Sequence, residues 1–373
     1  MGPAGLSTVA ALEIECASHH GRKHAVALGR GTWALALLLQ AIESKVRRKI
    51  LALPSFLCQT PLAGILHAGW QPLFVDVDPL TGLVPDSEWA NAASMGVGAM
   101  MLVHLFGNPA NPAFATELCR EKNIFLIEDA CQAVGGASGT RACGSFGDAA
   151  ILSFGRTKSI DAGTGGMLLT DDGILAAAVR RQAELQAYIA ADRYEALSAT
   201  ASRLFYERKD RLLDPVGDPA DEMSGAIDAW RELVPAAWRA DPGEILRQFA
   251  GLSQMVAERR RKWNLYSKLL AGTGIEPLRL AAGAVPWRYC FRMPHVARAR
   301  KVSLVATLRA KGVHVSNWYV PTHWMSPQPC LRSGNLDGTL KLHAEIFQLW
   351  LDPATDDARI RADAAVFTDA LTA

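Results

Sequence analysis

Short apolar runs alternate with longer segments of helical period along the first half of the 373-residue chain. Residues 24–44, "HAVALGRGTWALALLLQAIES", predict a strand, a glycine turn and a helix. Further strands are predicted within 49–56, 71–78, 98–107, 124–131, 148–155 and 165–172, and helices within 60–69 and 111–123. This alternation is typical of helices that cover a largely parallel sheet.

The second half has a different pattern. Residues 173–213 keep a helical period and are rich in Ala and Arg, and residues 214–225 interrupt it. Residues 243–270 predict one long helix that leads into a second domain. In that domain strands are predicted within 288–296 and 313–321, and a helix that ends at a glycine within 301–312.

The length and the composition fit two domains. Half of the residues are hydrophobic and a fifth are charged, so the chain can bury a large core. We expect a large domain over 1–250, with an insertion-like helical region at 174–240. A smaller C-terminal α+β domain, which includes the bridging helix, is expected over 251–373.

The charge balance disfavours large anionic partners. Lys and Arg number 39 and Asp and Glu 37, a net charge of +2 that creates no general field for nucleic acid or an anionic membrane. Seven scattered cysteines without a C-x-x-C pair argue against a disulfide framework and a zinc cluster, and no run is long enough to span a membrane. We expect a cytoplasmic protein with no metal site, no nucleic-acid partner and no membrane contact.

Three segments carry polar groups where predicted strands end, at the edge where α/β proteins bind ligands. Gly31 and Thr32 precede a helix, which makes an anion site or an ordinary helix cap. Asp129 follows one strand and either caps the next helix or faces a ligand. Ser153 and Lys158 follow another strand among several glycines, where the lysine is either a solvated surface residue or part of a pocket.

Together the three segments describe one cofactor. Pyridoxal 5′-phosphate needs a lysine amine for its Schiff base, a carboxylate beside its ring nitrogen, and N–H or hydroxyl groups around its phosphate. Lys158, Asp129, and Gly31 with Thr32 supply these groups from successive strand ends. We therefore expect pyridoxal 5′-phosphate as the cofactor.

The same segments resemble the sugar aminotransferases of the DegT/DnrJ/EryC1/StrS family, within fold type I of the pyridoxal-phosphate enzymes. The likeness is close from about residue 24 to 172 and looser from about 244 to the end. It rests on ordered motifs: "GRGTWALAL", "LPSFLCQTPLAGILHAGWQPLFVDVDPLTG", "VHLFGNPAN", "LIEDACQAVGG", "GSFGDAAILSFGRTKSIDAGTGGMLLTDD", "SNWYVPTHW" and "IFQLWLDPATDDARI". The resemblance implies an α/β fold, with a mostly parallel central sheet flanked by helices and a smaller C-terminal domain.

The resemblance also implies residue roles. Lys158 would be the Schiff-base lysine, Asp129 the partner of the pyridinium nitrogen, and Gln132 a neighbour of the cofactor's phenolic oxygen. Thr32 and the amide of Trp33 would hold the phosphate, together with Gly31 and Ser153.

Some positions depart from the family pattern. Cys58 stands where an aromatic residue usually stacks on the cofactor ring, so Phe56 or another residue would have to compensate. The family's N-terminal segment looks shortened, and the helical stretch 174–235 is longer than expected. The family's loop with an asparagine that reaches the phosphate across the dimer cannot be recognised in this sequence, and Arg239 is the candidate in its place.

Four residues are candidates for substrate contact: His104, Arg239, Tyr319 and His323. Tyr319 and His323 follow the family pattern in the substrate strand, where Trp318 replaces a common histidine. For His104, which follows an apolar run, a buried hydrogen-bonded role is the alternative.

We therefore expect a homodimeric aminotransferase, with its active site at the subunit interface, that moves an amino group from an amino acid, usually glutamate, to a keto-sugar. The sugar would be nucleotide-linked and used in polysaccharide or secondary-metabolite biosynthesis. The alternatives are an inactive protein of the same fold with a regulatory or assembly role, and a sugar dehydratase, against which Lys158 argues because histidine replaces it there. A NAD-dependent dehydrogenase is a more distant alternative because the glycine fingerprint is incomplete.

Overall fold

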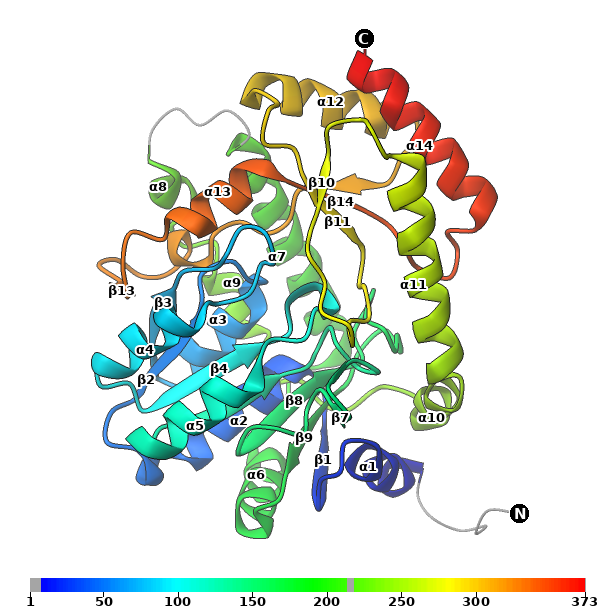
Figure 1. The fold of residues 1–373 in the computed structure, drawn as a ribbon. Coiled ribbons are helices and arrows are strands. Elements are labelled where there is room, and N and C mark those ends of the chain that lie inside the picture. Colours follow the sequence, from blue (N-terminus) through cyan, green and yellow to red (C-terminus); the bar gives the residue numbers. More distant parts are fainter. Residues whose placement is uncertain (1–7, 213–217, 373) are drawn as a thin grey trace.

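A central sheet of eight strands organises the large domain (Figure 1). The computed structural model describes residues 8–212 and 218–372. The strands lie in the order β1 (His24–Leu28), β9 (Gly166–Thr170), β8 (Ala149–Ser153), β5 (Phe125–Asp129), β4 (Ala99–Val103), β2 (Ile50–Pro54), β3 (Gln71–Val75) and β13 (Leu331–Arg332). Only β9 runs against the other seven, so the carboxyl ends of those seven strands share one edge of the sheet.

Helices cover both faces of this sheet, as the alternation of apolar runs and helical segments predicts. One face packs against α2 (Gly31–Ala41), α3 (Gln59–His67) and α6 (Gly173–Leu185). The other face packs against α1 (Thr8–His19), α4 (Asp86–Ser94), α5 (Pro112–Lys122) and α10 (Pro242–Ala250). Because both faces are covered, the strands are apolar on both sides, as in other parallel sheets.

A smaller antiparallel sheet forms the centre of the C-terminal domain. Its strands lie in the order β10 (Glu276–Pro277), β11 (Tyr289–Arg292), β14 (Ile346–Leu349) and β12 (Val315–Ser316). It packs with α11 (Leu252–Leu269), α12 (Arg298–Ala310) and α14 (Asp357–Thr372) (Figure 1). The predicted fold class, a mostly parallel sheet flanked by helices with a smaller second domain, is confirmed.

One C-terminal segment returns to the large sheet. β13 pairs in parallel with β3, and α13 (Asp337–Glu345) follows it. The carboxylate of Asp76, just after β3, accepts hydrogen bonds from the amides of Gly338 (2.8 Å) and Thr339 (2.6 Å) in the first turn of α13. This segment therefore crosses the boundary predicted near residue 250.

The prediction of one helix over 243–270 was wrong. Gly251 separates α10 from α11, and its amide donates to the carbonyls of Arg247 and Gln248 at the end of α10. Gly251 itself has φ −92° and ψ 5°, and α11 begins at the next residue, Leu252. The predicted strand at 313–321 is also shorter, since only Val315–Ser316 pairs with β14.

The helical region divides into several pieces. The predicted helical stretch 173–213 contains α6 and α7 (Ala191–Arg211), with non-helical residues between them. α8 (Pro219–Met223) lies within the predicted interruption, because Asp218 caps it through the amide of Ala220 (2.8 Å). α9 (Asp228–Glu232) follows and packs on α3. The short strands β6 (Ala137–Ser138) and β7 (Arg141–Ala142) form a separate hairpin.

His104 belongs to the core of the sheet, which corrects its prediction as a substrate contact. Its imidazole is fully buried, with Nε2 2.7 Å from Oε1 of Glu128. The amide of Ala110 donates to Nδ1 (3.0 Å), so Nε2–H is the group that donates to Glu128. Both ring nitrogens are thus used within the protein, and the buried alternative is the one that holds.

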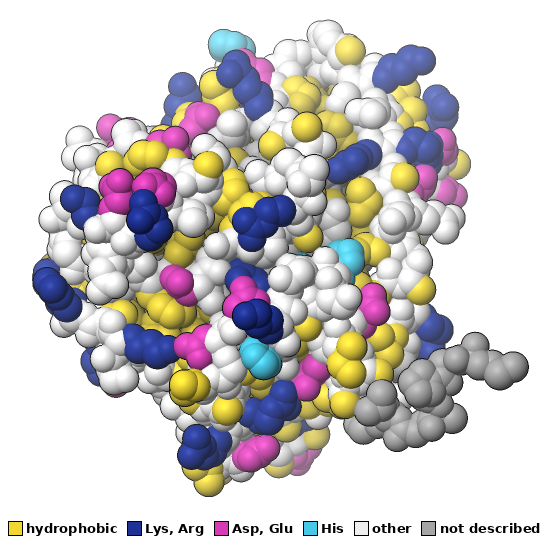
Figure 2. All heavy atoms as spheres, turned by 60° about the horizontal axis from the view of Figure 1, so that its bottom comes forward, with side chains coloured by type: hydrophobic (Ala, Val, Ile, Leu, Met, Phe, Trp, Pro, Cys, Tyr) yellow, Lys and Arg dark blue, Asp and Glu magenta, His cyan; other side chains and the backbone are white. Residues whose placement is uncertain are grey.

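The underside of the molecule carries charges of both signs. Figure 2 shows Lys and Arg side chains interspersed with Asp and Glu on this face, as a net charge of +2 leads one to expect. Among the described residues, no helix is long and apolar enough to cross a membrane.

Glu128 gives a stability prediction with a pH dependence. Burial alone would raise its pKa, but bonds from His104 and the amides of Gly144 and Phe146 hold it below the ordinary 4.5. The stabilisation is therefore present above pH 4.5 and is lost as the pH falls through the lower folded-state pKa. Glu128→Gln turns an amide NH₂ toward these donors. We therefore expect it to lower the free energy of unfolding by about 3–5 kcal/mol at neutral pH.

Urea unfolding of the wild type and Glu128→Gln across the acidic range measures this. The difference between the two proteins should shrink as the pH falls below 4.5. Glu117→Gln is the control, since Glu117 forms an exposed pair with Arg120, and it should change stability little. A pH-independent difference would contradict the prediction.

Gly29 gives a second stability prediction. A Cβ at this position would lie 1.9 Å from the carbonyl oxygen of Ala236, so the two backbones can approach only if residue 29 is glycine. We expect Gly29→Ala to lower the free energy of unfolding by about 1–3 kcal/mol. Gly334→Ala is the matched control, because nothing lies within 4 Å of its added Cβ. Equal urea midpoints for the two variants would refute this account.

Candidate functional site

The glycine turn after β1 lies against the end of β8. Leu28 and Ser153 both pair with Gly166 of β9, which brings their strand ends together. A Cβ on Gly31 would lie 2.9 Å from the carbonyl oxygen of Leu152 and 3.2 Å from the Cβ of Ser153. Gly31 is therefore required for this close approach, and the turn and Ser153 border one space.

The first turn of α2 provides hydrogen-bond donors at this edge. Arg30, at the N-cap, makes no side-chain cap, and Ala34 is the first residue whose amide bonds back to it. The amides of Thr32 and Trp33 therefore have no acceptor inside the helix. The Thr32 hydroxyl also has no hydrogen-bond partner in the described part of the chain, whereas the Trp33 indole is fully buried beneath. Such a turn suits an anion.

Asp129 and Lys158 both influence the thiol of Cys131 through their charges. The Asp129 carboxylate is buried and accepts the amide N–H of Cys131 at 2.9 Å. Close packing raises the pKa of the Cys131 thiol well above its usual value; the negative charge of Asp129 adds to this and the positive charge of Lys158 opposes it. Asp129 ends β5 and Lys158 follows β8, the neighbouring parallel strand, so both residues belong to the same edge of the sheet.

Lys158 stands on a strained turn. The preceding Thr157 has φ +67°, a left-handed conformation that a β-branched residue adopts rarely. Its amide donates to Oδ2 of Asp161 (2.6 Å), and its carbonyl accepts from Nε1 of Trp287 (2.5 Å). These contacts hold the backbone beside the half-buried Lys158, and backbone strain of this kind gathers at functional sites.

Gln132 and Tyr319 form a buried pair next to this turn. Gln132 accepts the amide N–H of Phe106 (2.7 Å) and donates through Nε2 to the Tyr319 hydroxyl. The Tyr319 ring lies parallel to Phe106 (5.5 Å, 4°) and to Trp287 (6.4 Å, 10°). Burial raises the pKa of Tyr319 well above 10, and the nearby Cys58 adds to the rise. Trp287 is a site residue that the sequence analysis missed.

Phe56 does not take the place of an aromatic residue at position 58. It is half-buried before α3, with Sγ 3.4 Å from the Thr60 hydroxyl oxygen. Phe56 is fully buried, edge-on against Phe106 and Tyr319, so its faces are not open to a ligand. The place of Cys58 at the face of the cofactor ring stays a prediction.

His323 is buried away from solvent. Its Nδ1 lies 2.6 Å from the Ser55 hydroxyl oxygen, and burial lowers its pKa to about 4, so the imidazole is neutral at physiological pH. Its part in substrate binding, like that of Tyr319, stays a prediction.

Arg239 lies on the segment that crosses the glycine turn. Its exposed guanidinium donates to the carbonyl of Ile189 (3.1 Å) and stands 5.3 Å from the Tyr194 ring centre. Arg30, from the turn itself, donates to the hydroxyl of the same tyrosine. Two arginines therefore flank one tyrosine beside the candidate phosphate turn.

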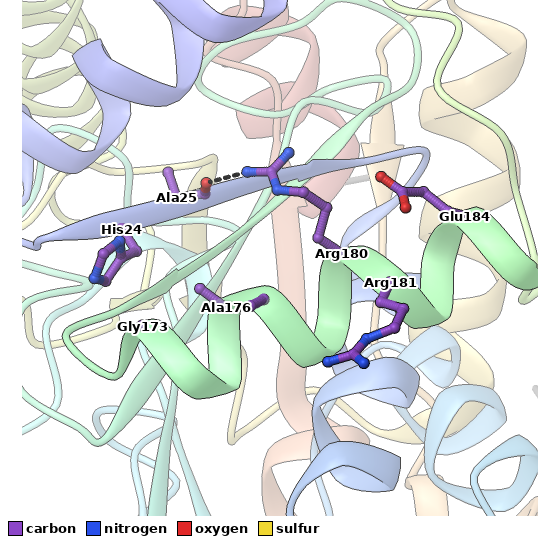
Figure 3. A pocket seen from close by; sticks show the side chains of 8 residues that line it. His24, Ala25, Gly173, Ala176, Arg180, Arg181 and Glu184 are labelled. Atoms are coloured by element: carbon purple, nitrogen blue, oxygen red, sulfur yellow. Dashed lines mark hydrogen bonds between the residues drawn. The ribbon is translucent and has the colours of Figure 1, made fainter.

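Two cavities lie elsewhere. A groove of about 320 Å³ runs between the start of β1 and α6, where Arg180 donates to the Ala25 carbonyl (Figure 3). It includes His24, at the end of β1 opposite to the glycine turn. A second cavity of about 430 Å³ lies among α7, α12, α13 and β14. No predicted site residue lines either one.

The residues at the carboxyl edge fit pyridoxal 5′-phosphate. An amine and a buried carboxylate follow the neighbouring strands β8 and β5, and the uncapped turn at Gly31 offers free amides and a free hydroxyl beside Ser153. A carbonyl-bearing ring with a phosphate arm needs this combination of groups.

Comparisons with known proteins agree with this chemistry. The sequence model of the DegT/DnrJ/EryC1/StrS aminotransferase family matches residues 5–198 and 245–364. The match begins well before residue 24 and so includes α1. Residues 199–244 lie outside both matched stretches, which agrees with the longer helical region that the sequence predicts.

Individual relatives are distant. A dTDP-4-dehydro-2,3,6-trideoxy-D-glucose 4-aminotransferase of Saccharopolyspora spinosa is 28% identical over 364 residues, 96% of this chain and 88% of that protein. A GDP-perosamine synthase of Caulobacter vibrioides is 35% identical, but the match spans only 44% of each protein. The crystal structure of DesI in the presence of its TDP-sugar product is 25% identical, with a TM-score of 0.75 over 99% of this chain and 86% of that one.

The family model, the Saccharopolyspora spinosa relative and the DesI structure each match most of the chain, in both domains. The chain therefore belongs to the DegT/DnrJ/EryC1/StrS aminotransferase family and is a pyridoxal-phosphate-dependent aminotransferase.

Proposed function

We propose that this enzyme transfers an amino group from an amino acid, glutamate being the expected donor, to a nucleotide-linked keto-sugar. The observation that carries the proposal is that Asp129 and Lys158 follow the neighbouring strands β5 and β8, at the same sheet edge as the uncapped turn at Gly31. The sugar acceptor is supported by the relatives, which are named for dTDP- and GDP-linked sugars. Polysaccharide or secondary-metabolite assembly is the expected use of the product.

Each site residue has a task in this reaction. When bound, pyridoxal 5′-phosphate supplies a carbonyl that takes up amines and a ring that accepts electrons. Lys158 would hold the cofactor and, once displaced by the donor, move a proton at the donor's Cα. Asp129 would keep a proton on the ring nitrogen. Gln132, already fixed by Phe106 and Tyr319, would lie beside the phenolic oxygen.

The phosphate would bind at the start of α2. The amides of Thr32 and Trp33 point out of the first turn, and the hydroxyls of Thr32 and Ser153 lie at the same edge. Arg239 and Arg30 flank Tyr194 nearby and add positive charge. We also propose a homodimer with the active site at the interface, as the family resemblance implies.

The proposed reaction is tested by following the visible absorption of the bound cofactor. We expect L-glutamate to bleach this absorption, and one member of a panel of nucleotide-linked keto-sugars to restore it. Lys158→Ala should lose the absorption of the lysine-bound cofactor and slow amino transfer by at least about 10²–10⁴-fold, the usual contribution of a positioned acid–base group.

Lys23→Ala is the control for this test. Lys23 is exposed just before β1, at the edge of the sheet away from the site, and its replacement should leave absorption and rate unchanged. If wild-type protein takes up the cofactor but no keto-sugar of the panel restores the absorption, the sugar acceptor is wrong. If Lys158→Ala keeps the absorption, the assignment of Lys158 is wrong.

Cys58 gives a prediction on cofactor affinity. A thiol covers less of a ring face than an aromatic side chain, and stacking of aromatic rings contributes about 0.5–1.5 kcal/mol. We expect Cys58→Tyr to bind pyridoxal 5′-phosphate about 2- to 10-fold more tightly in titrations of cofactor-free protein. Cys58→Ser, of nearly the same size, should bind as the wild type does. Weaker binding by Cys58→Tyr would show that the position does not face the ring.

A further inference from the structure

Arg288 is a buried cation without a carboxylate partner. It precedes β11 and is 5% exposed. Its Nη1 donates to the hydroxyl oxygen of Ser316 (2.9 Å) and to Oε1 of Gln348 (3.3 Å), both neutral. In the described ranges no Asp or Glu oxygen lies within 4.0 Å of it, whereas the equally buried Arg292 contacts two glutamates. An uncompensated buried charge is costly, and an anionic ligand would offset that cost.

Two indole rings fix the guanidinium group. Its central carbon lies 4.0 Å from the ring centre of Trp287 and 3.8 Å from that of Trp350. These faces stabilise a positive charge and restrain its orientation. Nε and Nη2 have no hydrogen-bond partner among residues 8–212 and 218–372, so one edge of the group remains available. Burial lowers the pKa of Arg288 to about 10, which leaves it charged at neutral pH.

Arg288 lies on the face of the small sheet that is turned toward the large domain. Successive side chains along a strand alternate between faces. Tyr289 and Phe291 belong to the hydrophobic core of the small domain. Cys290, on the same face as Arg288, belongs instead to the hydrophobic core of the large domain, together with Trp287 and Tyr319.

Trp287 links this face to the cofactor lysine. Its Nε1 donates to the carbonyl of Thr157, the residue before Lys158. The Trp287 ring also lies parallel to that of Tyr319, whose hydroxyl bonds Gln132. Arg288 therefore lies beside the candidate site.

We propose that Arg288 binds a carboxylate of the amino donor, an inference that rests on the proposed function. With Nη1 engaged by Ser316 and Gln348, the remaining Nε–Nη2 edge presents two parallel N–H groups. A planar carboxylate accepts such a pair with both oxygens, and the match is specific to arginine. Arg288 thus selects an amino acid as the donor.

Glutarate, a dicarboxylate without an amino group, tests this binding apart from catalysis. Calorimetry on the cofactor-loaded enzyme should show glutarate binding to the wild type. We expect Arg288→Gln to weaken glutarate binding about 10- to 100-fold. Arg288→Lys keeps the charge but loses the pair of parallel N–H groups, so its glutarate affinity should lie between those of the wild type and Arg288→Gln. Arg292→Gln is the matched control on the same strand and should keep the glutarate affinity even where stability falls.

The half-reactions supply a second measurement. Arg288→Gln should raise the glutamate concentration needed for half-maximal bleaching of the cofactor absorption, while the reverse reaction with a nucleotide-linked amino sugar keeps its dependence on sugar concentration. Unchanged glutarate binding in Arg288→Gln, or weakened binding of the nucleotide sugar alone, would overturn the proposal; the second result would assign Arg288 to the diphosphate. If Arg288→Gln does not fold, Arg288→Lys carries the comparison. A wild type that takes up no cofactor would instead refute the proposed function.

Discussion

The close approach of three backbones at Gly31 and Gly166 is the constraint on which the site depends. A Cβ on Gly166 would lie 2.3 Å from the amide nitrogen of Gly31, and one on Gly31 would reach the carbonyl of Leu152. Because β9 runs against its neighbours, it joins the ends of β1 and β8 and leaves the start of α2 beside Ser153. The other parallel strands run in the same direction, so their carboxyl ends lie at this edge too, and Asp129 is at the end of one of them.

Contacts from distant parts of the chain then fix the groups within this frame. Trp287 comes from the start of the small domain and holds the turn that carries Lys158. Tyr319 comes from the segment after β12 and holds Gln132. The site is therefore assembled by both domains, although its amine, carboxylate and anion turn all belong to the large one.

The sequence predicted the parts of the site that depend on local pattern. Apolar runs, glycine turns and the residues that follow strands placed Gly31, Asp129, Ser153 and Lys158 at one edge, since parallel strands make that edge common. Helix boundaries were less accurate where one glycine interrupts a continuous helical period, as Gly251 does.

Features that depend on long-range contact were not predictable in this way. Thr157 adopts a left-handed conformation because Asp161 and Trp287 hold it, and no turn residue signals it. Glu128 of the neighbouring strand accepts a hydrogen bond from the buried His104, a pairing that the apolar run before His104 does not reveal. The role of a residue at a strand end is decided by which face of the sheet its side chain takes.

The helical region between α6 and α10 has a mechanical consequence. α7 contacts α9, which packs on α3 of the large domain. On the other side, Lys209 of α7 donates to Asn317 (2.6 Å), and Tyr206 packs on Trp318 in the segment after β12. The C-terminal part of α7 thus contacts the segment after β12, and the same helix packs through α9 against the large domain. Any hinge motion that separates the two sheets must first break the contacts of Lys209 with Asn317 and of Tyr206 with Trp318.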